Sequence, residues 1–291
     1  MPDSRIPEDP VAELLQVLNL KDSGENSFQG TTQWMPGGRV FGGQVLAQSL
    51  VAASATVDQD RRVHSLHSYF LRPGALDVPI NFEVDILRDG RSFSARRVQA
   101  SQESKVIFSM IASFQIPTDG VEHADKMPTG VSEPETLPSA KDLLGSFDHP
   151  VARYWANARP FDLRHEAESV YLKPATTKSN EQAVWFKPVS ELKIDGPLAQ
   201  AALAYASDYT ILESIMRAHG LSWAHPGLKS ASLDHAMWFH AEPDFSDWML
   251  YVQRSPATQS GRGLATGQIF NRNGVLVASV AQEGMMRIPA I

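Results

Sequence analysis

Three polar residues in the second half of the chain could together activate a water molecule. Asp208 lies in the apolar segment LAYASDYTILESI, where an ionised carboxylate is unstable unless it is paired or hydrogen-bonded. Ser232 opens a strand-like segment, SLDHAMWF, and Gln282 interrupts the apolar segment LVASVAQEGMM. A hydroxyl and a carboxamide each offer a hydrogen-bond donor and an acceptor. A carboxylate with these two neighbours could hold and polarise water for a hydrolysis.

Each of the three residues also has an ordinary structural explanation. An Asp on a helix can face solvent, and Ser or Gln is common on the solvated face of a strand. A comparison of the two halves of the chain favours chemistry for the acid. Residues 27–57, which contain the corresponding helix of the first half, include no Asp or Glu. A packing requirement would be expected in both halves. Ser65 and Gln115 match Ser232 and Gln282 there without an acid, so we interpret them as structural.

The composition excludes several classes of protein. The chain of 291 residues has 26 Lys and Arg against 33 Asp and Glu, a net charge of −7. Nucleic-acid binders need clustered cations to neutralise phosphates, so no nucleic-acid partner is expected. With no cysteine there is no disulfide, thiolate metal site or cysteine nucleophile. The nine histidines show no metal-ligand spacing, and we expect neither a metal nor another cofactor.

The sequence predicts a protein without a membrane span. No apolar run approaches the roughly 20 residues that a spanning helix needs. The first ten residues, MPDSRIPEDP, are polar, and the last five, RIPAI, match no known address signal. The absence of cysteine fits a reducing compartment. We therefore expect a cytoplasmic protein.

Hydrophobic periodicity divides the first half into two helices and four strands. Asp9 and Pro10 form an N-cap and first-turn signal for a short helix. The segment 40–55 is apolar or small on every side, which predicts a helix buried on all faces. Alternating apolar residues predict strands at residues 64–71, 79–87, 92–102 and 105–116. The pair Asp89-Gly90 predicts a hairpin turn.

The second half repeats this order after a change in composition. Six prolines between residues 117 and 160 indicate a linker, with one short helix near residues 140–144. A long helix is predicted over residues 197–219, ending at Gly220. Asn273-Gly274 predicts a second hairpin turn. Strands are predicted at residues 169–173, 183–187, 230–240, 248–254, 263–270 and 274–287.

A helix followed by four strands therefore occurs twice, which predicts an α+β fold of two similar units. In each unit a long antiparallel sheet would curl around one buried helix. We expect an N-terminal domain at residues 1–116, a Pro-rich linker at 117–164 and a C-terminal domain, with the three candidate residues, at 165–291. Edge-to-edge pairing of the two sheets would protect strand edges that otherwise favour aggregation.

Seven segments resemble the acyl-CoA thioesterase II family. They are VFGGQVLAQSL (40–50), VHSLHSYFLRPG (63–74), LRDGRSFSARRV (87–98), IFSMIASFQ (107–115), YASD (205–208), ASLDHAMWFH (231–240) and GVLVASVAQEGMMR (274–287). These segments lie in both halves and outside the predicted linker. Members of that family consist of two hotdog domains in one polypeptide. The resemblance therefore implies two tandem hotdog domains.

The resemblance also implies roles for the three candidate residues. The family's catalytic acid lies in a segment of the YASD type and corresponds to Asp208. Its Ser or Thr hydroxyl corresponds to Ser232, and its Gln before Glu-Gly corresponds to Gln282. The implied reaction is hydrolysis of acyl-CoA to a free fatty acid and CoA, with Asp208 as general base on a water that Ser232 and Gln282 orient. We expect acyl-CoA as the small-molecule partner and a homo-oligomeric assembly.

Two other functions are compatible with a hotdog fold. Hotdog hydratases and dehydratases combine an Asp or Glu with a His a few residues away, whereas the next His after Asp208 is His219. Asp234 and His235 are not expected to act as a pair, because neighbours on a strand point to opposite faces. A non-catalytic acyl-CoA-binding module would need no acid on its central helix, so Asp208 argues against it.

Two further features have competing explanations. Gly42 and Gly43 could bring backbone amides close to a developing oxyanion, but we interpret them as packing residues. Four arginines near the turn at residues 89–90 could meet CoA phosphates, although a solvated hairpin tip explains them equally well: Arg88, Arg91, Arg96 and Arg97.

Overall fold

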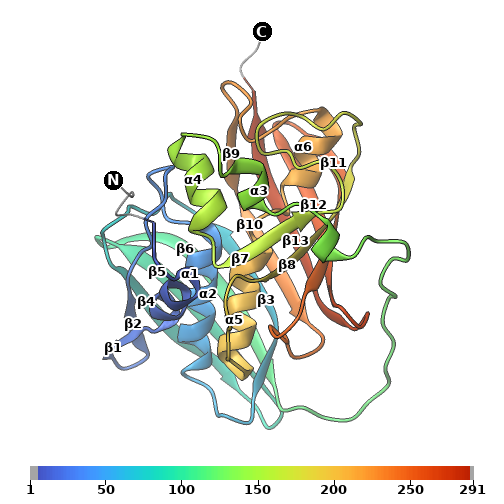
Figure 1. The fold of residues 1–291 in the computed structure, drawn as a ribbon. Coiled ribbons are helices and arrows are strands. Elements are labelled where there is room, and N and C mark those ends of the chain that lie inside the picture. The colour runs from blue at the N-terminus through green and yellow to red at the C-terminus, as the bar shows by residue number, and fades with distance from the viewer. Residues whose placement is uncertain (1–5, 289–291) are drawn as a thin grey trace.

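Residues 6–288 of the computed structural model form a strongly curved antiparallel sheet that encloses two long helices (Figure 1). The sheet has 13 strands. The strand order is β1 (Lys21–Gly24), β2 (Ser27–Gly30), β4 (Ile80–Asp89), β5 (Phe93–Gln102), β6 (Lys105–Gln115), β3 (Arg62–Phe70), β10 (Asp234–Phe239), β13 (Leu276–Arg287), β12 (Arg262–Asn271), β11 (Met249–Gln259), β8 (Glu181–Pro188) and β7 (Phe161–His165), with β9 (Lys229–Ser232) paired to β13. The expectation that the chain ends carry no targeting signal rests partly on residues 1–5 and 289–291, which lie outside the described residues.

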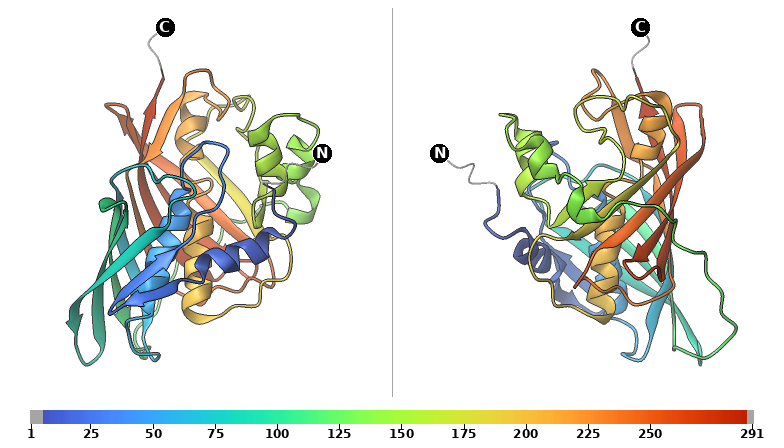
Figure 2. Two further views of the ribbon diagram at one scale, coloured as in Figure 1. Left: turned by 90° about the vertical axis from the view of Figure 1, so that its left-hand side faces the viewer. Right: turned by 45° about the vertical axis from the view of Figure 1, so that its right-hand side comes forward.

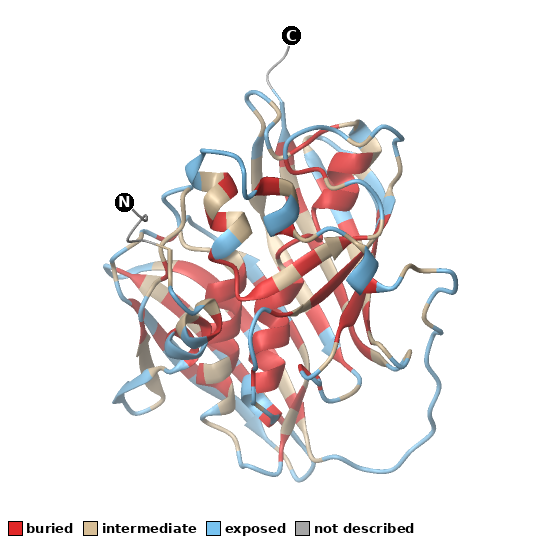
Figure 3. Ribbon diagram, in the orientation of Figure 1, coloured by how far each residue is buried: buried red, intermediate tan, exposed pale blue. Residues whose placement is uncertain are grey.

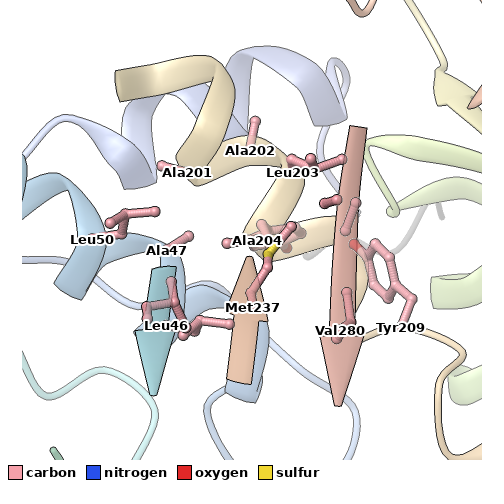
Figure 4. Packing of buried hydrophobic residues seen from close by; sticks show 14 of the residues in the cluster. Leu46, Ala47, Leu50, Ala201, Ala202, Leu203, Ala204, Tyr209, Met237 and Val280 are labelled. Atoms are coloured by element: carbon pink, nitrogen blue, oxygen red, sulfur yellow. The ribbon is translucent and has the colours of Figure 1, made fainter. Parts of the chain in front are cut away.

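The two enclosed helices, α2 (Gly42–Ser54) and α5 (Gly196–Ser207), pack against each other. Nearly every residue of both helices is buried (Figure 3), as predicted for residues 40–55. Small side chains such as Ala47, Ala201 and Ala204 let the two helices approach each other. Leu46 of α2 and Met237 of β10 fill the space between the helices and the sheet (Figure 4). This arrangement confirms the predicted α+β fold, in which a sheet curls around buried helices.

The shorter helices lie around this core. α1 (Pro10–Leu18) begins at Asp9, whose carboxylate accepts hydrogen bonds from the next turn as predicted. α3 (Ala140–Leu144) confirms the short helix expected in the Pro-rich segment, whereas α4 (Pro150–Asn157) was not predicted. Both lie on the side of the central helices that the sheet leaves open (Figure 2). α6 (Glu213–His219) follows α5 toward the opposite end of the molecule.

The two halves of the sheet join edge to edge along β3 and β10. The antiparallel register runs from Asp234 opposite Tyr69 to Trp238 opposite Ser65. The Ser68 hydroxyl adds a hydrogen bond of 2.8 Å to the carbonyl of His235. The expected pairing of the two sheets is therefore confirmed, and it leaves no free strand edge at the centre of the molecule.

The prediction of one helix over residues 197–219 is wrong. α5 ends at Ser207, Asp208 is its C-cap, and a turn leads to α6. Side chains from the sheet form hydrogen bonds with polar groups of this turn: Gln182 donates to the Thr210 carbonyl, and Gln253 donates to the Thr210 hydroxyl. These tertiary bonds replace helical ones, and no local sequence signal reports them.

The strand predictions are confirmed within a few residues, with two exceptions. Residues 169–173 form no strand; Val170 and Tyr171 are buried, but their carbonyls accept hydrogen bonds from the loop amides of Trp223 and Ala224. The segment 230–240 is two strands, β9 and β10, separated at Leu233. Three strands were not predicted: β1 and β2 are short and polar, and β7 crosses the predicted boundary between the linker and the C-terminal domain.

The packing of α2 on α5 makes Gly43→Ala a test of the helix pair. An added Cβ at Gly43 would lie 2.6 Å from the Tyr205 carbonyl oxygen, a backbone atom that cannot move alone. We expect Gly43→Ala to lower the unfolding free energy by about 1–3 kcal/mol, the usual cost of overpacking. Thermal unfolding would measure it. Gly37→Ala is the control, because nothing lies within 4 Å of its added Cβ. Equal stability of the two variants would contradict the close approach.

Candidate active site

Asp208, Ser232 and Gln282 converge at one point although they lie far apart in the sequence. The Gln282 amide nitrogen donates to Asp208 Oδ1 at 2.9 Å and to Ser232 Oγ at 2.8 Å. Ser232 Oγ lies 3.5 Å from the same carboxylate oxygen, at the limit of a hydrogen bond. The three residues proposed from the sequence are thus brought into one hydrogen-bonded group.

Each of the three residues is held by a different element. Asp208 stands where α5 ends, so its carboxylate projects beyond the helix. Ser232 is the last residue of β9 and lies across from Gly284 of β13. Gln282 lies within β13 and is fully buried, with 0% of its surface exposed. The fixed amide of Gln282 therefore links the end of the helix to the end of β9.

The N-terminus of α2 faces the Asp208 carboxylate. The backbone amide of Gly43 is close enough to that carboxylate to lower its pKa. A Cβ on Gly42 would lie 2.8 Å from Asp208 Oδ2, so only glycine allows the approach. The N-cap residue Phe41 makes no side-chain cap, which leaves first-turn amides available. Our interpretation of both residues as packing glycines was incomplete, because Gly43 also supplies an amide to the acid.

The surroundings of Asp208 make it a stronger base than an exposed aspartate. Burial raises the pKa of Asp208 to about 6, while hydrogen bonds from Gln282, Gly43 and Ser232 lower it by a smaller amount. A carboxylate with this pKa is ionised near pH 7 and holds a proton more strongly than an ordinary Asp. Such a group suits proton abstraction from water.

His235 is a part of the site that the sequence analysis missed. It is fully buried, and its Nδ1 contacts Gln282 Oε1 while its Nε2 lies 3.0 Å from Ser207 Oγ. Burial lowers the pKa of His235 to about 4, so the ring is neutral near pH 7. Asp234 points away, toward the amide of Glu283, as strand alternation predicts. The same alternation, which excluded an acid–His pair, turns His235 inward toward Gln282.

The hydrogen-bond chain fixes which atoms carry protons. An ionised Asp208 can only accept, so the NH₂ of Gln282 faces it and the amide oxygen faces His235. His235 must then carry its proton on Nδ1. Its bare Nε2 lies 3.0 Å from Ser207 Oγ, whose single hydroxyl proton is shared between that nitrogen and the Ala204 carbonyl, 2.8 Å away. His235 thus holds the Gln282 amide in the orientation that Asp208 requires.

Two cavities, each of about 350 Å³, meet at Gly42 and Ser232. The first, which we call the Phe70 cavity, is lined by Val45, Phe70, Ile107 and Phe108, with Arg39 and Arg72 also on its wall. The second, the Tyr209 cavity, is lined by Asp208 and by aromatic and charged residues, including Phe41, Tyr154, Trp155, Arg159, Tyr209 and Trp223. A substrate with two arms could extend into both cavities with its reacting centre beside Asp208.

The four arginines near residues 89–90 line neither cavity. Arg96 is buried and bonded to Asp89 at 2.8 Å, and Arg97 pairs with Asp85.

Within residues 6–288 no helix is long and apolar enough to cross a membrane, and no group of three potential His or acidic metal ligands comes together.

The raised pKa of Asp208 predicts that Asp208→Asn stabilises the protein. In the folded state ionisation occurs near pH 6, about two units above an ordinary Asp, so the charge opposes folding by up to about 3 kcal/mol at pH 8. This cost declines as the pH falls from 6 and vanishes below the unfolded pKa of 3.8, where both states hold the proton. Denaturant unfolding should show Asp208→Asn more stable than the parent at pH 8, with the difference lost once the pH is well below 4. If Asp208→Asn were less stable than the parent at both pH values, the Asp208 charge would not lower the unfolding free energy as predicted.

Comparison with known proteins gives matches over both halves of the chain. Residues 31–115 match the family described as acyl-CoA thioesterase N-terminal domain, and residues 160–285 match the family described as acyl-CoA thioesterase. Acyl-CoA thioesterase 2 of Haemophilus influenzae is 38% identical over 281 residues, covering 94% of this chain and 96% of that protein. Acyl-coenzyme A thioesterase 8 of Homo sapiens is 36% identical over 284 residues, covering 94% and 88%.

Solved structures agree with these sequence matches. An acyl-CoA thioesterase II from Mycobacterium marinum superimposes with a TM-score of 0.79 at 40% identity, covering 95% of this chain and 99% of that one. A hot dog fold protein from Alicyclobacillus acidocaldarius, at 19% identity, gives a TM-score of 0.78 over 96% and 99% of the two chains, which supports the fold alone. The chain has a tandem hotdog fold and belongs to the acyl-CoA thioesterase family.

Proposed function

We propose that this protein hydrolyses fatty acyl-CoA to a free fatty acid and CoA. The observation that carries the proposal is a carboxylate of raised pKa, bonded by Gln282 and Ser232, at the junction of two cavities. Relatives that match over nearly the whole chain are named acyl-CoA thioesterases. The pantetheine arm and the acyl chain of such a substrate would occupy the two cavities.

In this mechanism Asp208 removes a proton from water as the water oxygen attacks the thioester carbonyl carbon. Ser232 orients that water through its hydroxyl, which lies only at the limit of a hydrogen bond to Asp208, and Gln282 holds the hydroxyl and the carboxylate in place with its two N–H groups. Negative charge develops on the carbonyl oxygen, and the N-terminal turn of α2, which lies beside Asp208, supplies a positive dipole there. The C–S bond then breaks, and the proton held by Asp208 passes to the departing sulfur.

One active centre per chain follows from the same geometry. In the second half the C-cap of the central helix is Asp208, whereas the C-cap of the corresponding helix α2 is Ala55. The first half contributes its helix N-terminus instead of an acid. A hotdog hydratase or dehydratase has less support, because His235 is enclosed behind Gln282 and does not lie beside the substrate cavities. A non-catalytic binding module has less support because it would need no acid such as Asp208.

The reaction and its catalytic residues can be tested together. With palmitoyl-CoA as substrate, release of free thiol is expected from the parent, and only a hydrolase produces it. Asp208→Asn should lower kcat by about 10²–10⁴-fold, because it removes the base and keeps the shape. Gln282→Ala should lower kcat less. Ser232→Thr, which keeps the hydroxyl, should retain most activity, whereas Ser232→Ala should not. Thiol release at the parent rate by Asp208→Asn would refute the assignment.

The role of His235 can be separated from a merely structural one by the pH profile. The parent should lose activity below about pH 6, where Asp208 becomes protonated. His235→Leu removes the donor to the Gln282 amide oxygen, so the Gln282 side chain can rotate and its NH₂ group is no longer held toward Asp208. We expect a kcat about 10-fold lower and an acid limb at higher pH, since losing a donor raises the pKa of Asp208. His235→Asn keeps an N–H near the same place and should restore both. An unshifted acid limb in His235→Leu would contradict positioning.

We further propose that the protein is a cytoplasmic homo-oligomer with the domain boundaries 1–116, 117–164 and 165–291. The cysteine-free composition supports a reducing compartment. An apolar group on the outer face of the central strands supports self-association: Tyr69, Ile111 and Trp238 are 62%, 48% and 37% exposed. They lie on adjacent strands β3, β6 and β10. Light scattering of the purified protein would measure its assembly state.

A further inference from the structure

Arg159 is a buried cation without an acidic partner, although the Tyr171 hydroxyl is close enough to act as an acceptor. It follows α4, and only 8% of its surface is exposed. Its Nε and Nη1 are enclosed and donate to no atom. Among residues 6–288 no carboxylate oxygen lies within 4.0 Å of its guanidinium. The charge is instead surrounded by rings, with its central carbon 4.7 Å from the centre of Tyr209, 5.2 Å from Trp155 and 5.9 Å from Tyr171.

The other buried arginines of the described chain all have partners. Arg61 donates to Ser94 and to the Gly90 carbonyl, Arg96 pairs with Asp89, and Arg217 donates to the Glu168 carbonyl. Burying a guanidinium with unused donors is strongly unfavourable, and contacts with aromatic rings offset only a part of this. An unpaired guanidinium among paired ones therefore requires a specific explanation.

A nearby carboxylate does not satisfy Arg159. Glu213 interacts with Arg159 only through longer-range charge. One Glu213 oxygen accepts from His165 at 2.7 Å, and the other accepts from Trp223 at 2.9 Å. Nε and Nη1 of Arg159 remain without an acceptor within the described chain.

Arg159 also lies where a substrate would reach it. It lines the Tyr209 cavity together with Asp208. It also lines a third cavity of about 330 Å³, on the side of Lys141, Arg164 and Lys187, which adds positive charge. Tyr209, whose ring contacts the guanidinium, directly follows the proposed general base in the chain. The guanidinium thus stands between the reacting centre and a basic cavity.

We propose that Arg159 is a subsite for an oxyanion carried by the acyl-CoA substrate, which rests on the proposed function. The planar guanidinium fork matches the oxygens of a carboxylate or a phosphate. Two parts of a substrate supply such oxygens: a carboxylate at the far end of the acyl chain, or a phosphate of CoA. In either case Arg159 holds the ground state and the transition state alike, so its loss raises KM with little effect on kcat.

The test compares Arg159→Gln with the parent on three thioesters: hexanoyl-CoA, adipoyl-CoA and hexanoyl-N-acetylcysteamine. An acyl carboxylate bound by Arg159 predicts a kcat/KM loss of about 10- to 100-fold for adipoyl-CoA alone. A bound CoA phosphate predicts a similar loss for both CoA thioesters and none for the N-acetylcysteamine thioester, which lacks phosphate. Equal losses on all three substrates, or no loss on any, would overturn the subsite.

Arg164→Gln is the matched control. Arg164 also lies over an aromatic ring and lines the basic cavity, but it is paired with Asp162 at 2.9 Å and does not line the Tyr209 cavity. It should leave the substrate pattern unchanged. If Arg159→Gln does not fold, Arg159→Lys serves, since it keeps the charge without the fork and should show the same pattern with a smaller loss.

Binding measurements separate failure of the subsite from failure of the proposed function. Calorimetry with CoA and adipoyl-CoA on Asp208→Asn, with and without Arg159→Gln, needs no turnover. A weakened affinity in the double variant would support the subsite even if the parent released no thiol. An unchanged affinity for both ligands would overturn it even if the parent proved to be a thioesterase.

Discussion

The hydrogen bond from the Gln282 amide to Asp208 is the interaction on which the site depends. A carboxylate in these surroundings would lose its charge if burial acted alone. Donors from Gln282, from Gly43 and, more weakly, from Ser232 oppose that effect, and the resulting pKa is about 6. The acid is therefore both ionised near neutrality and more basic than an exposed Asp. Full solvation would give only the first of these properties, and full burial would give only the second.

This interaction requires a rigid frame that neither half of the chain supplies alone. The acid and its amide partner come from the second half, while Gly43 comes from the helix of the first half. The pairing of β3 with β10 and the packing of α2 on α5 fix the two halves relative to each other. His235, buried at this joint, fixes the Gln282 amide in turn. The two similar halves therefore contribute differently: α5 provides a carboxylate at its C-terminus and α2 provides amides at its N-terminus.

Asp208 and Arg159 carry opposite charges that the protein leaves incompletely neutralised, and both line the Tyr209 cavity. Groups of this kind lower the stability of the folded chain, and their persistence points to a role in binding or chemistry. Arg164 and Arg96 show the alternative, since each is paired and belongs to the framework. Incomplete neutralisation therefore distinguishes the charged residues that line the Tyr209 cavity from the charged residues that only stabilise the fold.

From the sequence alone we could predict the α+β class, most strands and the buried helix at 40–55, because local periodicity carries these signals. Asp208, Ser232 and Gln282 could be named as candidates from the comparison of the two halves and from the resemblance to a family. The folded structure was needed to show that α5 ends at Ser207, that His235 contacts Gln282, that Gly43 lies beside the acid and that Nε and Nη1 of Arg159 lack an acceptor. Each of these depends on side chains and amides from strands or helices distant in sequence. Local pattern carries no information about which distant donor meets which acceptor, because that is fixed by how the sheet closes around the two helices.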